Sequence, residues 1–174
     1  MFATILLPNF ALQAAMRHEG LSSSTPVALI DTQTNKAVII QLNQAAEKAG
    51  IRAGMSPSQA LGRCLSLVAK ARSPMKEESL ANIILPYAFS LSPYVETTAP
   101  GVWTIQFTDN RNLFAKFSDL VNQLAECEVV AQVGIAPDPD ASLLIAHLAR
   151  SVLEVDNPKK YLAPLSASLL AITL

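Results

Sequence analysis

The sequence predicts an α+β fold, in which a sheet of ferredoxin-like type is covered by helices and carries a small helical insertion. Short apolar segments rich in β-branched residues alternate with stretches of helical periodicity. Residues 42–72 interrupt this alternation with short capped helices. At 174 residues and 51% hydrophobic, the chain is long enough for one well-buried core with a small subdomain attached.

The first predicted unit is a strand followed by a helix. Residues 2–7 are apolar and suit a buried strand, and Asn9 suits the N-cap of a helix that stops at Gly20. The stretches PVALID and KAVIIQL then predict a hairpin, with a turn at Asn35.

The insertion at residues 42–72 is predicted to be helical. Its first helix is closed by Gly50, and its second begins at Ser56 with Pro57 in the first helical position. Gln59 completes a capping box with Ser56.

The second half of the chain predicts further helices and strands. The longest helix begins at Pro74, with Met75, Leu80 and Tyr87 on one face and a kink at Pro86. The later elements are a strand at GVWTIQF, a helix at DNRNLFAKFSDLVNQL, a buried strand at VVAQVGIA, and a helix that begins at PDPDAS and runs to about Val152.

Composition argues against several classes of protein. The 13 basic and 14 acidic residues give no field that would hold a nucleic acid strongly. The 2 cysteines show no metal-binding spacing and suit a reducing compartment, and no apolar run approaches the ~18 residues of a membrane span. We therefore expect a cytoplasmic protein, and the apolar C-terminal stretch suggests a piece of a longer chain.

Isolated polar residues give weak candidates for chemistry. Asp138 and Asp140 are close enough in sequence to share a cation, but helix capping explains them more simply. Glu96 and Asp109 flank a predicted strand, and His147 has no nucleophile or metal ligand at a readable spacing. The sequence contains none of the common phosphate-binding, hydrolase or metalloprotease motifs.

Four stretches together resemble the palm and fingers of Y-family (UmuC/DinB-type) translesion DNA polymerases. They are ILLPNFALQA, AAEKAGIRAGMSPSQALGRCLSLV, SPYVE before GVWTIQFTD, and VGIAPDPDASLLIAHLA. The second stretch is similar to the family pattern ARxxGVRSGMPxxxAxxxCPxLV. The resemblance implies a palm-like domain at residues 1–41 and 73–174, a fingers-like insertion at 42–72, and no thumb or little finger in this chain.

The resemblance also implies that the metal-binding positions are degenerate. Phosphoryl transfer in such a palm uses metal ions held by carboxylates. The family's first strand ends in DxD, and Leu7 and Asn9 stand at those positions. The SIDE motif before the next strand is matched by residues 99–102, so that Gly101 and Val102 replace its acidic residues.

The triphosphate contacts of the family are altered in the same way. Its Tyr and Arg in the fingers correspond to Gln44 and Glu47, and the Lys after its GIAxN corresponds to Pro139. A glutamate at such a place repels a triphosphate.

These losses make the chain similar to the catalytically silent ImuB-like paralogues. The resemblance implies a non-enzymatic adaptor in translesion mutagenesis and the SOS response, without metal or cofactor. Its implied partners are an error-prone polymerase, the sliding clamp and a RecA-related accessory protein, while DNA is bound weakly.

Two other interpretations stay open. An active nucleotidyltransferase could use displaced carboxylates such as Asp31, Glu96 or Asp109, and would bind a triphosphate with magnesium. An unrelated ferredoxin-like domain for protein interaction would lack the fingers-like insertion at residues 42–72.

Overall fold

The computed structural model describes residues 1–32, 37–109 and 111–165. The chain divides into two compact units. Met1–Pro8 and Ile83–Leu174 form the first, which we call the five-stranded unit, and Asn9–Asn82 form the second, which we call the three-stranded unit.

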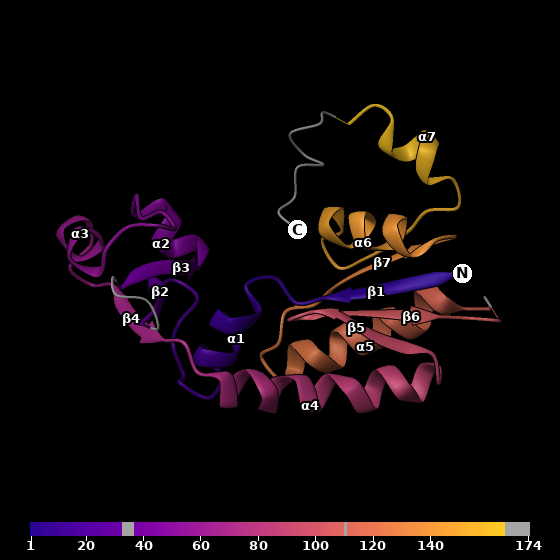
Figure 1. Cartoon of the computed structure of the whole chain (residues 1–174), viewed down its shortest axis with the longest axis horizontal. Coiled ribbons are helices and arrows are strands. Elements are labelled where there is room, and N and C mark those ends of the chain that lie inside the picture. The colour runs from indigo at the N-terminus through magenta and orange to yellow at the C-terminus, as the bar shows by residue number, and fades with distance from the viewer. Residues whose placement is uncertain (33–36, 110, 166–174) are drawn as a thin grey trace. The chain divides into compact units, whose positions relative to one another are not determined.

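The sheet of the five-stranded unit has the N-terminal strand at its centre (Figure 1). Its order is β5 (Val95–Ala99), β6 (Val102–Gln106), β1 (Phe2–Leu6), β7 (Gln132–Ala136) and β8 (Val152–Glu154). Strand β1 is antiparallel to both neighbours, and Ile5 pairs with Trp103 and with Val133. The end of β1 therefore lies where β6 begins.

Helices cover both faces of this sheet (Figure 1). Strand alternation sends Ile5 and Thr4 to opposite faces, and both side chains are fully buried. On the Thr4 face lies α6 (Pro139–Leu148), and α5 (Leu113–Glu126) packs in the core of the unit through Phe117. The Phe117 ring meets that of Phe107 edge-on, with centroids 5.8 Å apart.

The three-stranded unit has the sheet order β3 (Val38–Leu42), β2 (Val27–Asp31), β4 (Val68–Ala71). Its helices are α1 (Phe10–Met16), α2 (Gln44–Lys48) and α3 (Pro57–Arg63). The predicted capping box of α3 is confirmed, because Gln59 N–H donates to Ser56 Oγ and Ser56 N–H donates to Gln59 Oε1. Its core includes Ile39 and Ile51.

Two further helices complete the described chain. Helix α4 (Pro74–Leu91) starts in the three-stranded unit and ends in the five-stranded unit, and it continues through Pro86. Helix α7 (Pro158–Leu162) follows β8. In the part of the chain that the structure describes, no helix is long and apolar enough to cross a membrane.

The predicted α+β class is confirmed, but three strands were not predicted. Strand β4 lies inside the stretch expected to be helical, and β5 precedes GVWTIQF. Strand β8 starts at Val152, where the last helix was expected to end, and that helix, α6, already ends at Leu148. Such short strands depend on pairing with distant neighbours rather than on their own propensity. The expected turn at Asn35 lies outside the described residues.

Candidate functional site

The structure brings two of the polymerase-like segments together at the end of β1. Leu6 pairs with Val102, and the Leu7 N–H donates to the carbonyl oxygen of Gly101 at 2.9 Å. Gly101 has φ 79°, which the tight β5–β6 turn requires and which suits glycine. Leu7, Gly101 and Val102 therefore lie next to one another.

These three positions offer no side-chain oxygen to a metal ion. The side chain of Leu7 is buried at 2% exposure, and Val102 packs against Leu6 and Ala146. Among the residues that the structure describes, no three His, Cys, Asp or Glu side chains gather into a metal site. The side chains of Leu7 and Val102 contribute to packing.

Asn9 belongs to the three-stranded unit. It precedes α1 in the left-handed conformation, with φ 49°, and is exposed. The expected side-chain cap is absent there, because the Asn9 Nδ2–H donates to the Leu42 carbonyl at 3.3 Å instead. Asn9 is thereby tied to the end of β3, just before α2.

The three triphosphate-contact positions fall in different units. Gln44 and Glu47 lie about one turn apart on α2, and both side chains are exposed. Arg52 Nη1 donates to the Glu47 carbonyl at 2.9 Å. Pro139 lies in the five-stranded unit as the first residue of α6.

The candidate displaced carboxylates have different surroundings. Asp109 is held by Arg111, with Nη2 at 2.8 Å and Nε at 3.0 Å from Oδ2, and these hydrogen bonds lower the Asp109 pKa to about 2. Asp31 ends β2 in the three-stranded unit. Glu96 stands on β5, opposite Thr104 of β6.

The other polar candidates have structural roles. Asp138 caps α6 as expected, because its Oδ1 accepts the Ala141 N–H at 2.8 Å. Asp140 lies in the first turn of the same helix, where a negative charge is favourable. Burial lowers the pKa of His147, which lies in the last turn of α6.

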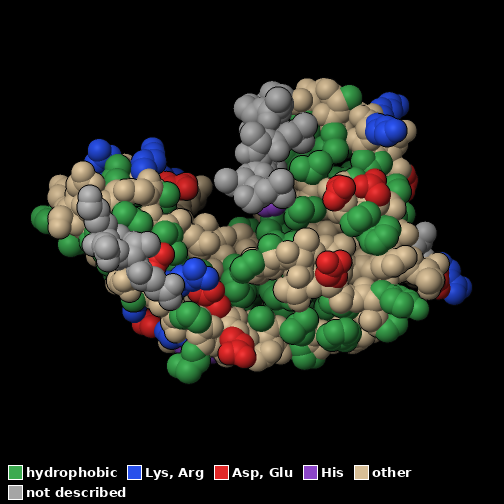
Figure 2. Space-filling view, in the orientation of Figure 1, with side chains coloured by type: hydrophobic (Ala, Val, Ile, Leu, Met, Phe, Trp, Pro, Cys, Tyr) green, Lys and Arg blue, Asp and Glu red, His purple; other side chains and the backbone are tan. Residues whose placement is uncertain are grey.

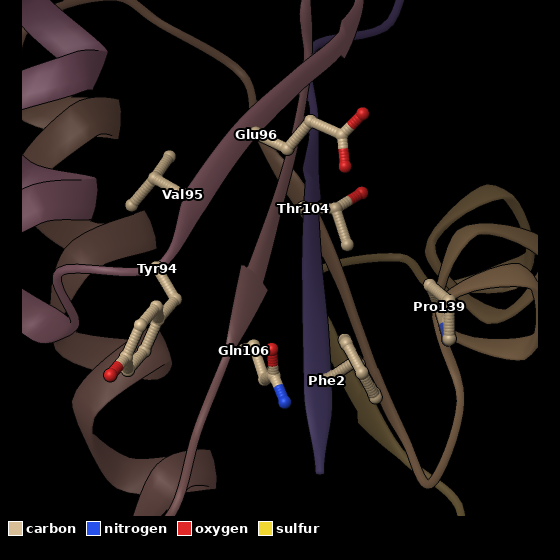
Figure 3. A pocket seen from close by; sticks show the side chains of 7 residues that line it. All are labelled: Phe2, Tyr94, Val95, Glu96, Thr104, Gln106 and Pro139. Atoms are coloured by element: carbon tan, nitrogen blue, oxygen red, sulfur yellow. The ribbon is translucent and has the colours of Figure 1, made fainter.

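A pocket on the sheet of the five-stranded unit was not predicted from sequence. It has a volume of about 280 Å³ and is lined by Phe2, Tyr94, Val95, Glu96, Thr104, Gln106 and Pro139. In Figure 3, Glu96, Thr104 and Phe2 extend toward the side where Pro139 lies. The signal in the sequence was the polar alternation of Thr104 and Gln106 within an otherwise apolar strand.

A buried hydroxyl pair links the same sheet to α6. Thr4 Oγ1 and Ser142 Oγ are 2.7 Å apart, and both residues are fully buried. Next to them, Gly134 of β7 lies against the backbone of Ser142 and Ala146 so closely that a Cβ has no room. Sequence reasoning missed both features because they depend on how β1 and β7 meet α6.

Comparison with known proteins identifies the family of this chain. The model of the impB/mucB/samB family matches residues 5–147, while no curated protein matches the sequence. The fold is similar to an insertion ternary complex of Dbh DNA polymerase (TM-score 0.83, 15% identity, 97% of this chain and 53% of that chain). It is also similar to DinB from Sulfolobus solfataricus (TM-score 0.73, 15% identity, 91% and 49%). This chain thus spans about half the length of the structures it matches.

These comparisons correct one expectation. The prediction that the chain is not an enzyme is wrong, because the family match and the similar folds are those of DNA polymerases. The lack of carboxylates at Leu7, Gly101 and Val102 did not justify that prediction, because a different carboxylate, that of Glu96, lies on the same sheet.

Proposed function

Because this chain belongs to the impB/mucB/samB family of UmuC/DinB-type Y-family DNA polymerase domains, we propose that it works in DNA damage tolerance as a cytoplasmic adaptor. In this role it binds other replication and repair proteins, as the resemblance to ImuB-like paralogues and to the SOS response suggests. The adaptor role concerns what the domain binds and does not depend on whether it also catalyses a reaction.

One observation carries the proposal. The Leu7 N–H to Gly101 carbonyl bond, at 2.9 Å, joins the two strand ends where the family's metal ligands are expected. The side chains there are a buried leucine, a glycine and a buried valine, so they stabilise the fold rather than hold magnesium. We propose that Leu7, Gly101 and Val102 serve the packing of the two strand ends.

The fingers-side positions support the same proposal. Gln44 is neutral and Glu47 is negative, and both are exposed on α2. Pro139 offers no charge at the start of α6. A triphosphate needs positive groups or metal ions, so these three positions favour no nucleotide. The proposal involves no cofactor.

The proposed domain boundaries are those that the resemblance implies. We propose that residues 1–41 and 73–174 form the palm-like domain and residues 42–72 the fingers-like insertion. The compact units divide the chain at 8/9 and 82/83 instead, because β2 and β3 pack with α2 and α3 in one cluster and β2 packs with α1 in another.

Nucleotidyl transfer with a displaced carboxylate is a second candidate function. Glu96 favours it, because this carboxylate lines a pocket on the palm-like sheet, where the resemblance implies catalysis. Asp109 is less suited because Arg111 occupies both of its oxygens.

The adaptor proposal is tested by direct binding. The purified chain is immobilised and exposed in turn to the sliding clamp, the error-prone polymerase and the RecA-related accessory protein of the same cell. We expect at least one complex with a Kd on the order of 1 μM, about 8 kcal/mol of binding free energy. A globular protein of similar size and net charge is the control. Absence of all three complexes at a hundredfold higher concentration would overturn the proposal.

A further inference from the structure

The lining of the pocket of about 280 Å³ in the five-stranded unit includes Thr104, which is one member of a chain of hydroxyl groups with a definite direction. Thr98, Thr104 and Thr4 lie on neighbouring strands, with oxygen separations of 2.9 Å and 3.4 Å, and Thr4 is 2.7 Å from Ser142. The Ser142 hydroxyl donates to the Pro139 carbonyl at 2.7 Å. The chain therefore crosses β5, β6 and β1 and ends at α6.

Each hydroxyl has one hydrogen to donate, and this fixes the direction. Because Ser142 gives its hydrogen to Pro139, it accepts from Thr4. Thr4 then accepts from Thr104 across the longest of the gaps, and Thr104 accepts from Thr98. Thr98 is exposed, and the outer end of the chain presents oxygen lone pairs.

The charge near Thr98 also favours a ligand that donates hydrogen bonds. Glu96 stands opposite Thr104, two residues from Thr98, and no Lys or Arg is among the residues that line the pocket. In Figure 2, the visible face of the five-stranded unit shows acidic and hydrophobic side chains, with basic ones at its margins. The Glu96 carboxylate in the pocket lining attracts a cation and repels a phosphate.

The geometry points to a site for an arginine side chain of a partner protein. A guanidinium donates in a planar fork that a carboxylate such as Glu96 accepts, and it stacks on aromatic rings such as that of Phe2. The volume lies just below the roughly 300–1,000 Å³ of sites for whole small molecules, which suits one side chain. A magnesium ion needs more oxygen ligands than the one carboxylate in this lining.

This inference rests on the proposed adaptor function, for which it names the chemistry of the partner. The test uses the whole 15N-labelled chain and two capped tripeptides, acetyl-Gly-Arg-Gly-amide and its neutral isostere with citrulline. We expect the arginine peptide to shift the amide signals of Glu96, Thr104 and Gln106, with saturation at millimolar concentration. The citrulline peptide is expected to leave them unchanged.

Two variants test whether the Glu96 carboxylate itself binds the arginine peptide. Glu96→Gln keeps the shape of the side chain and is expected to weaken arginine-peptide binding at least fivefold. Glu126→Gln removes an exposed charge from α5 and is expected to change nothing. Equal shifts with both peptides, no shift with either, or unchanged affinity in Glu96→Gln would overturn the inference.

Magnesium chloride alone is the third arm of the titration. A saturating shift at Glu96 with magnesium alone would overturn the arginine site in favour of a metal site. If a partner protein binds while the arginine peptide does not, this inference fails and the adaptor function stands. If the peptide binds and no partner protein does, the adaptor function fails.

Discussion

Gly134 marks the closest approach of sheet and helix in the five-stranded unit. A Cβ at this position would overlap the carbonyl oxygen of Ser142 and the amide nitrogen of Ala146, both in the backbone of α6. Backbone atoms of a helix cannot move aside as a flexible side chain can. Only glycine lets α6 lie close enough for Ser142 to reach Thr4.

Gly134→Ala is therefore expected to destabilise the protein. Overpacking of this kind costs about 1–3 kcal/mol and more where backbone must shift, so we expect the upper end. Urea denaturation followed by circular dichroism measures the free energy of unfolding. Gly62→Ala is the control, because Gly62 lies in α3 with open space around it and alanine there is expected to add about 1 kcal/mol of stability. Equal stability of Gly134→Ala and the parent chain would contradict the close contact.

The Asp109 carboxyl titrates at unusually low pH, with a pKa of about 2, because Arg111 donates to it through its side chain and backbone. We expect Arg111→Gln to raise this pKa toward the ordinary range of an aspartate, as followed by NMR of the Asp109 side-chain carboxyl carbon. Since the folded-state pKa is lowered, any stabilisation is present above the unfolded pKa and is lost as the pH falls through about 2. A pKa that stays near 2 in the variant would show that the Arg111 side chain is not its cause.

At the scale of elements, an ion pair anchors the start of α4. Arg72 Nε and Nη2 donate to the two carboxylate oxygens of Glu77 at 2.7 and 3.0 Å. The Glu77 side chain is 10% exposed and that of Arg72 37%. Glu77 raises the pKa of Arg72 through this contact. The helix is thus fixed to the residue that follows β4.

Glu77→Ala is expected to cost about 1–2 kcal/mol of stability, less than a fully buried pair because Arg72 stays partly in water. Thermal unfolding of the variant gives this difference. Glu78→Ala removes the same kind of side chain from an exposed position of the same helix and is expected to be nearly neutral. If both variants unfold at the same temperature, the ion pair contributes nothing to stability.

The elements that could be predicted are those with local signals. The capping box at Ser56 and the cap at Asp138 lie within the helices they begin, and both are confirmed. The buried face of α4 was predicted correctly for some residues and wrongly for others. Leu80 is buried, but Met75 and Tyr87 are exposed at 77% and 38%, because the face of a helix is set by what packs against it.

Over the full chain, the sequence predicted most of the strands and helices but not how distant ones meet. The end of β1 lies beside the β5–β6 turn through the Leu7–Gly101 hydrogen bond, although β5 itself was not predicted. The pocket joins side chains from β1, β5, β6 and the start of α6, up to 137 positions apart between Phe2 and Pro139. No local pattern specifies contacts over such distances.

The most direct test of the central claim is an NMR titration of the 15N-labelled chain with a deoxynucleoside triphosphate, with and without magnesium. The signals to follow are the amides of Leu7, Asn9, Gly101 and Val102, with Glu96 as the internal comparison. We expect no magnesium-dependent shift at the first four positions at millimolar ligand, because their side chains supply no carboxylate. A saturating, magnesium-dependent shift at Leu7 and Gly101 would contradict it and show that the strand ends still bind a metal-bound nucleotide.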